Sequence, residues 1–225
     1  MIVVYTVYLS QIKDISIYKK IECFDENEKK QIEGFDNEDY KKDFINRLFL
    51  KKNILSRHLN IPVNDVRLGK KEFGKPFLIN SHYGLDFNVS HTNDFFVCAI
   101  SDLGNIGIDA EEIVAINLEI AREFCCNNEL DDLSVGSNQS KLIKFYKIWT
   151  LKEAYLKAIG TGLNFSPKNV CFDVNDLSNI KINNIENNEW SFLTFNISNY
   201  MISVCSSYRI DAEGVSFVEL KIIDF

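Results

Sequence analysis

Two kinds of apolar spacing occur along the chain. Residues such as Phe44, Leu48 and Leu55 recur at helical intervals, and this pattern predicts three helices, at residues 38–60, 117–127 and 139–160. Runs rich in β-branched and aromatic residues predict eight strands, at residues 2–9, 86–90, 94–101, 105–112, 169–174, 191–197, 200–206 and 214–222. Long helices placed among strand pairs of the hairpin type predict an α+β fold.

The segments between these elements predict turns and loops. Ser198-Asn199 and His91-Thr92-Asn93 each separate two predicted strands, so both are expected to form hairpin turns. The polar segment at residues 126–140 predicts a surface loop, and the Asn-rich stretch at residues 183–189 predicts a solvated turn.

The apolar segments also limit the class of protein. Apolar residues make up 46% of the 225 residues, enough for a sizeable core. No apolar run approaches the roughly 18 residues that a membrane-spanning helix needs. The apolar N-terminus is β-branched and aromatic and lacks a basic leader, so we expect a strand rather than a signal peptide. We therefore expect a cytoplasmic protein that does not enter a membrane.

The cysteines and histidines show no metal-binding pattern. None of the six cysteines forms a CxxC pair, and the chain has three histidines. We expect reduced thiols and no zinc site.

The charge is unevenly distributed. The chain has a net charge of −7, all of it carried by residues 105–225. Residues 41–75 instead hold ten basic side chains against three acidic ones. Such a local positive field can attract a phosphate-bearing ligand, although a solvated helix face has the same composition. No aromatic residues interleave with the basic ones in the manner of a nucleic-acid reader, so we do not expect a nucleic-acid partner.

Two carboxylates share one face of the strand predicted at residues 105–112. Asp109 and Glu111 alternate with apolar residues, which places them roughly 7 Å apart beside Gly107. The glycine would leave room for a ligand. A hard cation such as Mg²⁺ would relieve the repulsion between the two acids. The alternative is an exposed acidic strand end.

The helix predicted at residues 139–160 carries charges near its apolar stripe. Lys152 falls within the stripe, Glu153 falls at its edge, and Lys157 lies one turn further on. A lysine on a core-facing stripe is costly unless it reaches a partner or a water-filled cleft. The alternatives are a lysine that snorkels to water and an ordinary stabilising Glu–Lys pair.

Four segments in order resemble the surfactin-type phosphopantetheinyl transferases. They are Phe73-Gly74-Lys75-Pro76, Phe87-Asn88-Val89-Ser90-His91, Gly107-Ile108-Asp109-Ala110-Glu111 and Trp149-Thr150-Leu151-Lys152-Glu153-Ala154-Tyr155-Leu156-Lys157, followed by Gly160-Thr161-Gly162. The family usually has a larger aliphatic residue where this chain has Ala110. The resemblance implies two similar lobes, at residues 1–104 and 105–225, related by a pseudo-twofold axis. Each lobe would be a small antiparallel sheet packed on a long helix, in a monomer with coenzyme A in the cleft between the lobes.

The resemblance also implies the chemistry. Such an enzyme moves phosphopantetheine from coenzyme A to a serine hydroxyl of an apo acyl or peptidyl carrier protein and releases 3′,5′-ADP. Asp109, Glu111 and Glu153 would hold Mg²⁺, for which Mn²⁺ can substitute. Glu153 would act as the base and Lys157 would stabilise negative charge on the phosphate or the leaving group.

Further residues are implied to bind coenzyme A. They are Lys75, Ser90, His91 and Lys152, with Lys41 and Lys42 among the lysines that could take the 3′-phosphate. The carrier protein would dock around residues 112–133, where Ile113, Ile116, Leu118, Phe124 and Leu130 could supply contacts.

Other functions remain open at this stage. A magnesium-dependent nucleotidyl- or phosphotransferase with another acceptor would be expected to carry a GxxxxGK[ST] loop, which the sequence lacks. A non-catalytic homologue that only binds carrier proteins would be expected to lack one of the three acids. A structural domain with an acidic strand would have the motifs by coincidence. The sequence leaves open whether the carrier serves fatty acid, polyketide or nonribosomal peptide synthesis.

Overall fold

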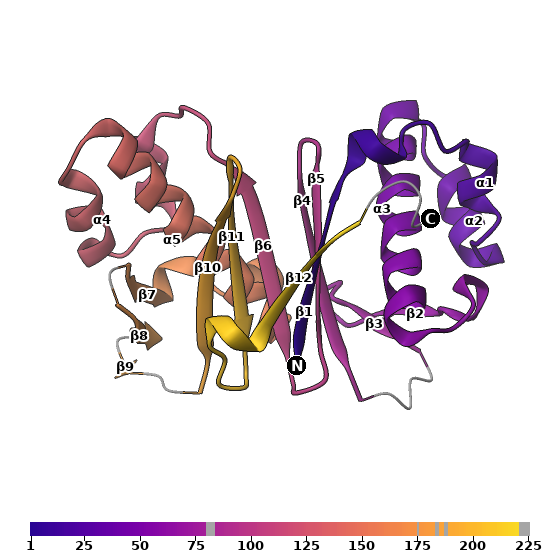
Figure 1. Ribbon diagram of the computed structural model, residues 1–225. Helices are drawn as coiled ribbons and strands as arrows, with labels where there is room; N and C mark the ends of the chain where they lie inside the picture. The colour runs from indigo at the N-terminus through magenta and orange to yellow at the C-terminus, as the bar shows by residue number, and fades with distance from the viewer. Residues whose placement is uncertain (80–83, 175, 183–184, 187–188, 221–225) are drawn as a thin grey trace.

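The chain folds into four layers. The structure is a computed structural model that describes residues 1–79, 84–174, 176–182, 185–186 and 189–220. Helices form the two outer layers, and two β-sheets lie between them (Figure 1). The predicted α+β fold with two similar lobes is confirmed.

The first lobe has a four-stranded sheet of order β12-β1-β5-β4. These strands are β1 (Ile2–Tyr8), β4 (Asp86–Thr92), β5 (Phe95–Ser101) and β12 (Val215–Glu219). The helices of this lobe are α1 (Ile17–Ile21), α2 (Glu26–Glu33) and α3 (Glu38–Leu59), and a short hairpin of β2 (Leu68–Lys70) and β3 (Pro76–Leu78) follows them. β12 returns from the far end of the chain and pairs with β1 in parallel, so this sheet is mixed rather than purely antiparallel.

The second lobe repeats this plan with a sheet of order β10-β11-β6. Its strands are β6 (Ile106–Glu112), β10 (Ser191–Ile197) and β11 (Tyr200–Ser206), and its helices are α4 (Asn127–Ser134) and α5 (Asn138–Ile159). The strands β7 (Val170–Asp173), β8 (Asp176–Ile182) and β9 (Ile185–Glu186) form a small separate sheet. Short 3₁₀ helices lie at Leu9–Ile12, Val63–Asp65, Leu118–Glu123, Gly162–Asn164, Pro167–Asn169 and Ala212–Gly214.

The two sheets bury apolar faces against each other. Ile108 and Ala110 of β6 pack in one core cluster with Val4 of β1 and Val97 of β5. The other face of each sheet packs on its own long helix, α3 or α5. The predicted alternation along β6 is therefore confirmed, and both faces of this strand are buried as far as Ala110.

Local sequence signals set the ends of the two long helices. Asn37 and Ser137 accept hydrogen bonds from backbone N–H groups of the first turns of α3 and α5. Asn60 and Gly160 end these helices in the left-handed conformation, with φ of 53° and 73°. The helices predicted at residues 38–60 and 139–160 are confirmed.

Several local predictions are wrong. The segment predicted as a surface loop contains α4, whose Glu129 closes a capping box and is fully buried. The helix predicted at residues 117–127 is a 3₁₀ helix over Leu118–Glu123. The sequence pattern also missed α1 and α2, because α1 has only five residues and α2 is rich in Glu and Lys, so each buries few apolar side chains.

Two turn predictions have different outcomes. Ser198-Asn199 joins β10 and β11 as expected. His91 and Thr92 instead continue β4, because Thr92 pairs with Phe95, and the turn contains Asn93 with φ of 42°. The turn predicted at residues 183–189 contains the short strand β9, and its residues 183–184 and 187–188 lie outside the described residues, as do residues 221–222 of the last predicted strand.

Cysteine pairing also differs from the prediction. Cys126 and Cys171 form a disulfide between the start of α4 and β7, with Cα atoms 6.0 Å apart, so the expectation of six reduced thiols is wrong for this pair. The other four cysteines are free and buried. Within the described part of the chain, no helix is both long and apolar enough to cross a membrane.

Candidate functional site

A cavity of about 900 Å³ lies between the two lobes. Its first-lobe wall comes from α2, α3, β2 and β4, and its second-lobe wall from β6 and α5. Six of the predicted site residues line it together: Ser90, His91, Asp109, Glu111, Glu153 and Lys157. The structure thus brings together residues that are more than sixty positions apart in the sequence.

The face of β6 that carries the acids is turned toward α5. Asp109 and Glu111 line the cavity at its second-lobe wall. Gly107 shares this face but is not a gap for a ligand, because a Cβ there would lie 1.9 Å from the carbonyl oxygen of Ala154. Gly107 therefore lets the α5 backbone approach β6, and the prediction that it makes room for a ligand is wrong.

Asp109 is joined to side chains from both lobes. Its Oδ1 accepts hydrogen bonds from Ser90 Oγ at 2.7 Å and from Lys157 Nζ at 2.6 Å. Lys157 Nζ also lies 3.0 Å from Ser90 Oγ. The Oδ2 atom of Asp109 is buried and has no hydrogen-bond partner. One oxygen of a buried carboxylate at the cavity wall is thus left without a donor.

One face of α5 completes this wall. Trp149, Glu153 and Lys157 are spaced four residues apart and all line the cavity. Trp149 Nε1 donates to Glu111 Oε1 at 3.3 Å. Burial, and then the charge of Asp109, raises the pKa of both Glu111 and Glu153. Like charges therefore crowd together here, which is the electrostatic condition that a bound cation relieves.

Side chains of β4 attach the first lobe to β6. The backbone N–H of Ile106 donates to Asp86 Oδ2 at 2.9 Å, and that of Ile108 donates to Asn88 Oδ1 at 3.1 Å. Ser90, next on the same face of β4, reaches Asp109. We call these three contacts the interlobe seam. They fix the register in which the two walls of the cavity meet.

Lys75 adjoins the interlobe seam at Asp86 and does not line the cavity. Its buried amine donates to Asp86 Oδ2 at 2.6 Å and to the carbonyl oxygens of Ile106 and Ala158 at 3.0 and 3.2 Å. Burial lowers the pKa of Lys75, while Asp86 raises it. The structure thus places Lys75 in a joint between β3, β4, β6 and the end of α5, outside the residues that line the cavity.

Lys152 also points away from the cavity. It is fully buried, and its amine pairs with Glu129 Oε2 at 2.8 Å and donates to the carbonyl oxygens of Pro167 and Val170. The prediction that this lysine needs a partner is confirmed, but the partner is a carboxylate of α4. In this arrangement Lys152 contacts no ligand in the cavity.

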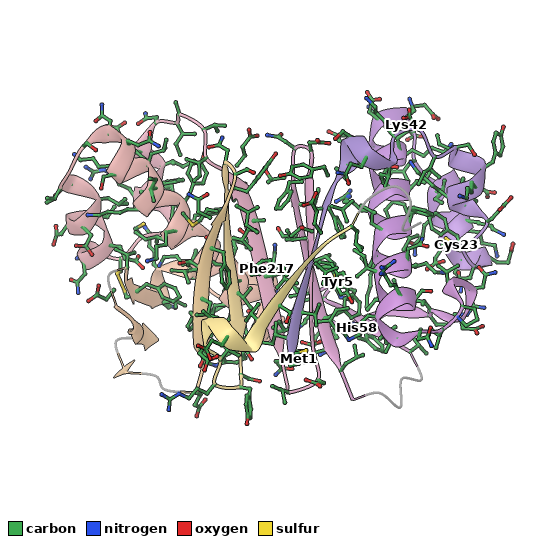
Figure 2. The ribbon with its side chains drawn as sticks, in the orientation of Figure 1. Met1, Tyr5, Cys23, Lys42, His58 and Phe217 are labelled. Atoms are coloured by element: carbon green, nitrogen blue, oxygen red, sulfur yellow. A yellow bond between two sulfur atoms is a disulfide. The ribbon has the colours of Figure 1, made fainter. Side chains whose placement is uncertain are left out.

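The basic residues that line the first-lobe wall differ from those predicted. Lys41 and Lys42 lie near the start of α3 outside the cavity lining; Lys41 pairs with Glu38 at 3.4 Å, and the exposed Lys42 is labelled in Figure 2. The cavity is instead lined by Arg47 and Lys51 of α3 and by Lys70 of β2. The helical spacing of Arg47 and Lys51 could have indicated this shared face.

His91 lies across the cavity from α3. Its Nε2 is 3.1 Å from an Arg47 guanidinium nitrogen, and Arg47 also pairs with Asp43 at 2.7 Å. Partial burial, and then the charge of Arg47, lowers the pKa of His91. A neutral His91 can accept a hydrogen bond from Arg47, which links α3 to β4 at the edge of the cavity.

Comparisons with known proteins agree with the family resemblance of the residues that line this cavity. The profile of the 4′-phosphopantetheinyl transferase superfamily matches residues 105–205, and the profile of the 4′-phosphopantetheinyl transferase N-terminal region matches residues 13–102. The chain belongs to the 4′-phosphopantetheinyl transferase superfamily. The predicted resemblance to the surfactin-type family is thereby confirmed.

Three relatives illustrate the similarity. The chain is 35% identical over 136 residues to the 4′-phosphopantetheinyl transferase gsp of Aneurinibacillus migulanus, which covers 60% of this chain and 55% of that protein. It is 27% identical over 177 residues to the transferase Sfp of Bacillus subtilis, covering 76% and 77%. It is 31% identical over 176 residues to the L-aminoadipate-semialdehyde dehydrogenase-phosphopantetheinyl transferase of Rattus norvegicus, covering 68% and 57%. The chain thus spans little more than half the length of two of these relatives.

A solved structure, that of Thermotoga maritima holo-[acyl-carrier-protein] synthase, is 20% identical and covers 45% of this chain and 61% of its own, with a TM-score of 0.37, too low to bear on the fold.

The three acids have the donor chemistry of a divalent-cation site but do not converge on a single point. Among the described residues, no group of three or more His, Cys, Asp or Glu side chains is close enough to hold a metal ion as it stands. The donor set is nevertheless suitable, because the unpartnered Asp109 Oδ2 and the crowded carboxyls of Glu111 and Glu153 border one cavity. The ammonium of Lys157 donates a hydrogen bond to Asp109 Oδ1 and is the positive charge beside the three acids in the structure.

Proposed function

We propose that this protein transfers the phosphopantetheine arm of coenzyme A to a serine hydroxyl of an apo carrier protein. The observation that carries the proposal is that Asp109, Glu153 and Lys157 border one cavity between two lobes of a chain from this superfamily. In the reaction, the serine oxygen attacks the phosphorus on the pantetheine side of the diphosphate. The bond to the adjoining phosphate breaks, and 3′,5′-ADP leaves with the electron pair.

The three acids are assigned to a magnesium ion. Asp109, Glu111 and Glu153 would hold Mg²⁺, or Mn²⁺ in its place, with Asp109 Oδ2 as the oxygen that has no competing donor. Bound there, the ion would neutralise charge on the diphosphate.

Glu153 is the proposed base. Burial, and then the charge of Asp109, raises its pKa, which makes this carboxylate a stronger base toward the serine hydroxyl. Lys157 lies on the same face of α5 and would place its ammonium near the departing phosphate oxygen.

We assign the second anionic group of coenzyme A, its 3′-phosphate, to the first-lobe wall. Arg47, Lys51 and Lys70 approach the cavity from two elements, in place of Lys41 and Lys42. Burial lowers the pKa of Lys51 to about 8, which indicates a cation held in a poorly solvated position that an anion would stabilise. Ser90 and His91 would contact the diphosphate between the two walls.

The carrier protein is proposed to dock beside the end of β6. Val114, Ile116 and Ile120 are exposed there at 44%, 38% and 55%. Ile113 and Phe124, which the sequence offered as docking contacts, are buried in the core and cannot serve. Because one chain supplies both walls of the cavity, we also propose a monomer, acting in the cytoplasm where carrier proteins and coenzyme A meet.

A mass-spectrometric assay tests the activity. The protein is incubated with coenzyme A, Mg²⁺ and an apo carrier protein, and the carrier is expected to gain the mass of phosphopantetheine. Glu153→Gln is expected to lower turnover by about 10²-fold or more, in line with the usual contribution of a general base. No adduct on several classes of apo carrier would favour a homologue that binds carriers without modifying them.

Lys157→Ala separates catalysis from binding. We expect it to lower turnover more than it lowers the affinity for coenzyme A, because the developing charge is on the leaving group. Calorimetry and single-turnover kinetics measure the two quantities. An affinity loss alone would contradict the role given to Lys157.

A further inference from the structure

The two lobes repeat one helical arrangement. In each lobe an eight-residue helix precedes a 22-residue helix: α2 and α3 in the first, α4 and α5 in the second. Each short helix begins with a capping box that ends in a glutamate, Glu28 in α2 and Glu129 in α4. The sheets beneath have matching strand orders, β1-β5-β4 and β6-β11-β10.

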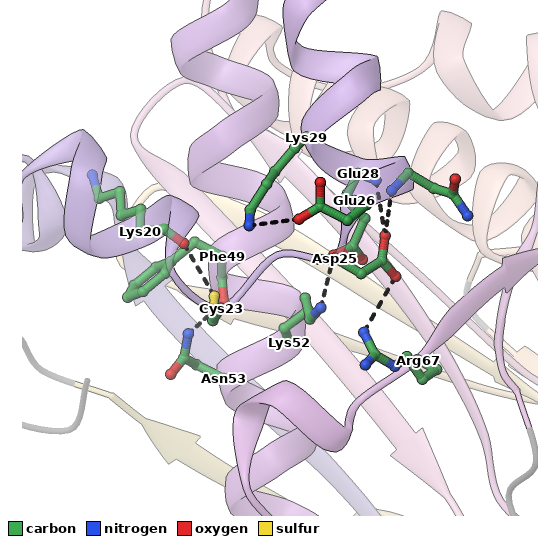
Figure 3. Close-up of polar contacts among 11 residues, drawn as sticks. Lys20, Cys23, Asp25, Glu26, Glu28, Lys29, Phe49, Lys52, Asn53 and Arg67 are labelled. Carbon is green, nitrogen blue, oxygen red and sulfur yellow. Dashed lines mark hydrogen bonds and ion pairs between the residues drawn. The ribbon is translucent and has the colours of Figure 1, made fainter.

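A buried lysine occupies the same position in both long helices. Lys52 and Lys152 are each the fifteenth residue of their helix, and neither is exposed to solvent. Lys52 Nζ lies 2.7 Å from Glu28 Oε2, and Lys152 Nζ lies 2.8 Å from Glu129 Oε2. Figure 3 shows Lys52 on α3 close to α2 and its Glu28. In both lobes, therefore, the long helix is joined to the capping carboxylate of the short one.

The surrounding groups make each contact specific. Oε2 of Glu28 also accepts from the backbone N–H of Asp25, at 2.8 Å. Glu129 accepts from the N–H groups of Cys126 and Phe172, both at 2.9 Å. The glutamate is thus fixed by its own helix cap, and the lysine can meet it at one rotation of the long helix only.

A gain in stability does not explain why the Lys52–Glu28 and Lys152–Glu129 pairs are buried. Desolvation of two ions offsets most of their attraction, so an apolar pair of similar volume would stabilise the fold as well or better. A buried ion pair is best explained where it selects one arrangement over others that pack equally well. Two helices packed through apolar stripes have such alternatives, because they can rotate or slide by one residue.

The residues beside these lysines in the sequence belong to the cavity. Glu153 follows Lys152, and Lys51 precedes Lys52; both Glu153 and Lys51 line the cavity, whereas neither buried lysine does. Lys152 is directed toward Glu129 of α4, and Lys52 toward Glu28 of α2, which stands at the cavity wall. Adjacent residues of a helix are about 100° apart, so fixing one side chain fixes the direction of the other.

We infer that the two buried pairs are positioning devices for the site: Lys152–Glu129 directs Glu153 toward the acids of β6, and Lys52–Glu28 directs Lys51 toward the first-lobe wall. This inference rests on the proposed function for the roles of Glu153 and Lys51. Neither lysine touches the reacting groups.

Two matched double variants test the inference. Lys152→Met/Glu129→Gln and Lys52→Met/Glu28→Gln each remove one pair without leaving a lone buried charge. The first is expected to lower kcat by about tenfold or more and to raise the Mg²⁺ requirement, with KM for coenzyme A within about twofold of wild type, because it disturbs groups that act in the transition state. The second is expected to raise KM for coenzyme A by about tenfold with kcat little changed, because it disturbs ground-state binding.

A purely structural role would give a different result. Loss of folded protein lowers the apparent kcat of either variant in proportion to the folded fraction and leaves KM unchanged. Both variants are therefore assayed well below their unfolding temperatures, with the folded fraction measured by circular dichroism. Wild-type kcat and KM in both folded variants would overturn the inference.

A second measurement tests the inference even if the proposed function is wrong. If the wild-type protein modifies no carrier, crystal structures of the two double variants still decide the matter. The inference requires Glu153 to turn away from Asp109 in the first variant and Lys51 to leave the cavity in the second. Unchanged directions of both side chains would overturn it.

Discussion

Among single residues, Lys51 of the first-lobe wall has a charge that depends strongly on its surroundings. Burial lowers its pKa to about 8, and Lys70 and Arg47 act in the same direction. A phosphate bound beside it would favour the ammonium form and raise the pKa in the complex. Ligand affinity should therefore depend on pH in the range where free Lys51 loses its proton.

The affinity for coenzyme A is expected to fall as the pH rises. Below pH about 8 the free protein already carries the ammonium, so the affinity for coenzyme A is at its full value. Above that pH the affinity falls, by up to about tenfold per pH unit, because binding must first restore the proton. Calorimetric titration with coenzyme A over a pH range spanning this pKa measures the fall.

The Lys51→Arg variant is the control for this titration. An arginine keeps its charge throughout the range, so it should bind coenzyme A with an affinity that no longer falls with pH. A wild-type profile as flat as that of the arginine variant would show that Lys51 does not contact the anion.

Sequence predicted some site residues and not others for a physical reason. The alternation of a strand placed Asp109 and Glu111 on one face, and the period of a helix placed Glu153 and Lys157 on one side. For Lys152, the helical period placed a charge on a buried face but could not identify its partner. That partner, Glu129, lies in α4, a segment whose sequence pattern predicted a loop.

At the scale of elements, the approach of α5 to β6 determines whether the site forms. A Cβ on Gly107 would lie 1.9 Å from the carbonyl oxygen of Ala154 and 2.5 Å from the backbone nitrogen of Ala158. Backbone atoms of a helix cannot yield as a flexible side chain can. Gly107→Ala should therefore push α5 away and destabilise the protein by about 1–3 kcal/mol or more.

Chemical denaturation of Gly107→Ala beside Gly34→Ala checks this expectation. A Cβ at Gly34 would find its nearest neighbour at 3.5 Å, an ordinary contact, so Gly34→Ala should leave the denaturation midpoint close to that of wild type. Equal midpoints for the two variants would mean that β6 and α5 have more room than the structure shows.

The joint made by Lys75 gives a second prediction for the elements. Its amine ties β4, β6 and the end of α5 together through Asp86 and two carbonyl oxygens. Lys75→Met should leave Asp86 without its cation and destabilise the protein by about 3–5 kcal/mol. Because Lys75 does not line the cavity, the folded variant should bind coenzyme A nearly as well as wild type.

Thermal unfolding and calorimetry of Lys75→Met and Lys71→Met separate the two roles. Lys71 is the exposed lysine nearby in the sequence, and its loss should change stability by at most about 0.5 kcal/mol. A Lys75→Met protein with wild-type stability and weak coenzyme A binding would restore the ligand contact that the sequence suggested for Lys75.

The elements that sequence patterns found best are those with a long apolar period. α3 and α5 each span 22 residues, and their ends match the predicted ranges within one residue. α4 was hidden because only Leu133 of its eight residues is a buried apolar side chain, while its buried Glu129 reads as a solvent-facing acid. The pairing of β12 with β1 depends on contacts across almost the whole chain, which local patterns do not report.

For the molecule as a whole, the position of charge matters more than its sum. The chain has a net charge of −7 and is proposed to bind a polyanion. Arg47, Lys51 and Lys70 concentrate positive charge at the first-lobe wall of the cavity. At physiological ionic strength the screening length is about 8 Å, so a ligand in the cavity responds mainly to these neighbours and little to acids on distant surfaces.

The effect of salt on the affinity for coenzyme A distinguishes the net charge from the local charge of the first-lobe wall. If the net charge governed binding, added salt would screen repulsion and strengthen the affinity for coenzyme A; if the local wall governs it, added salt weakens the affinity. We expect weakening, by several-fold between about 50 and about 300 mM salt, as the screening length shortens. Lys42 is exposed and lies outside the cavity, so Lys42→Gln should leave the dependence of affinity on salt unchanged, whereas Lys51→Gln should reduce it. Affinity that rises with salt, or a slope that Lys42→Gln reduces as much as Lys51→Gln, would place the anion outside the wall formed by α3 and β2.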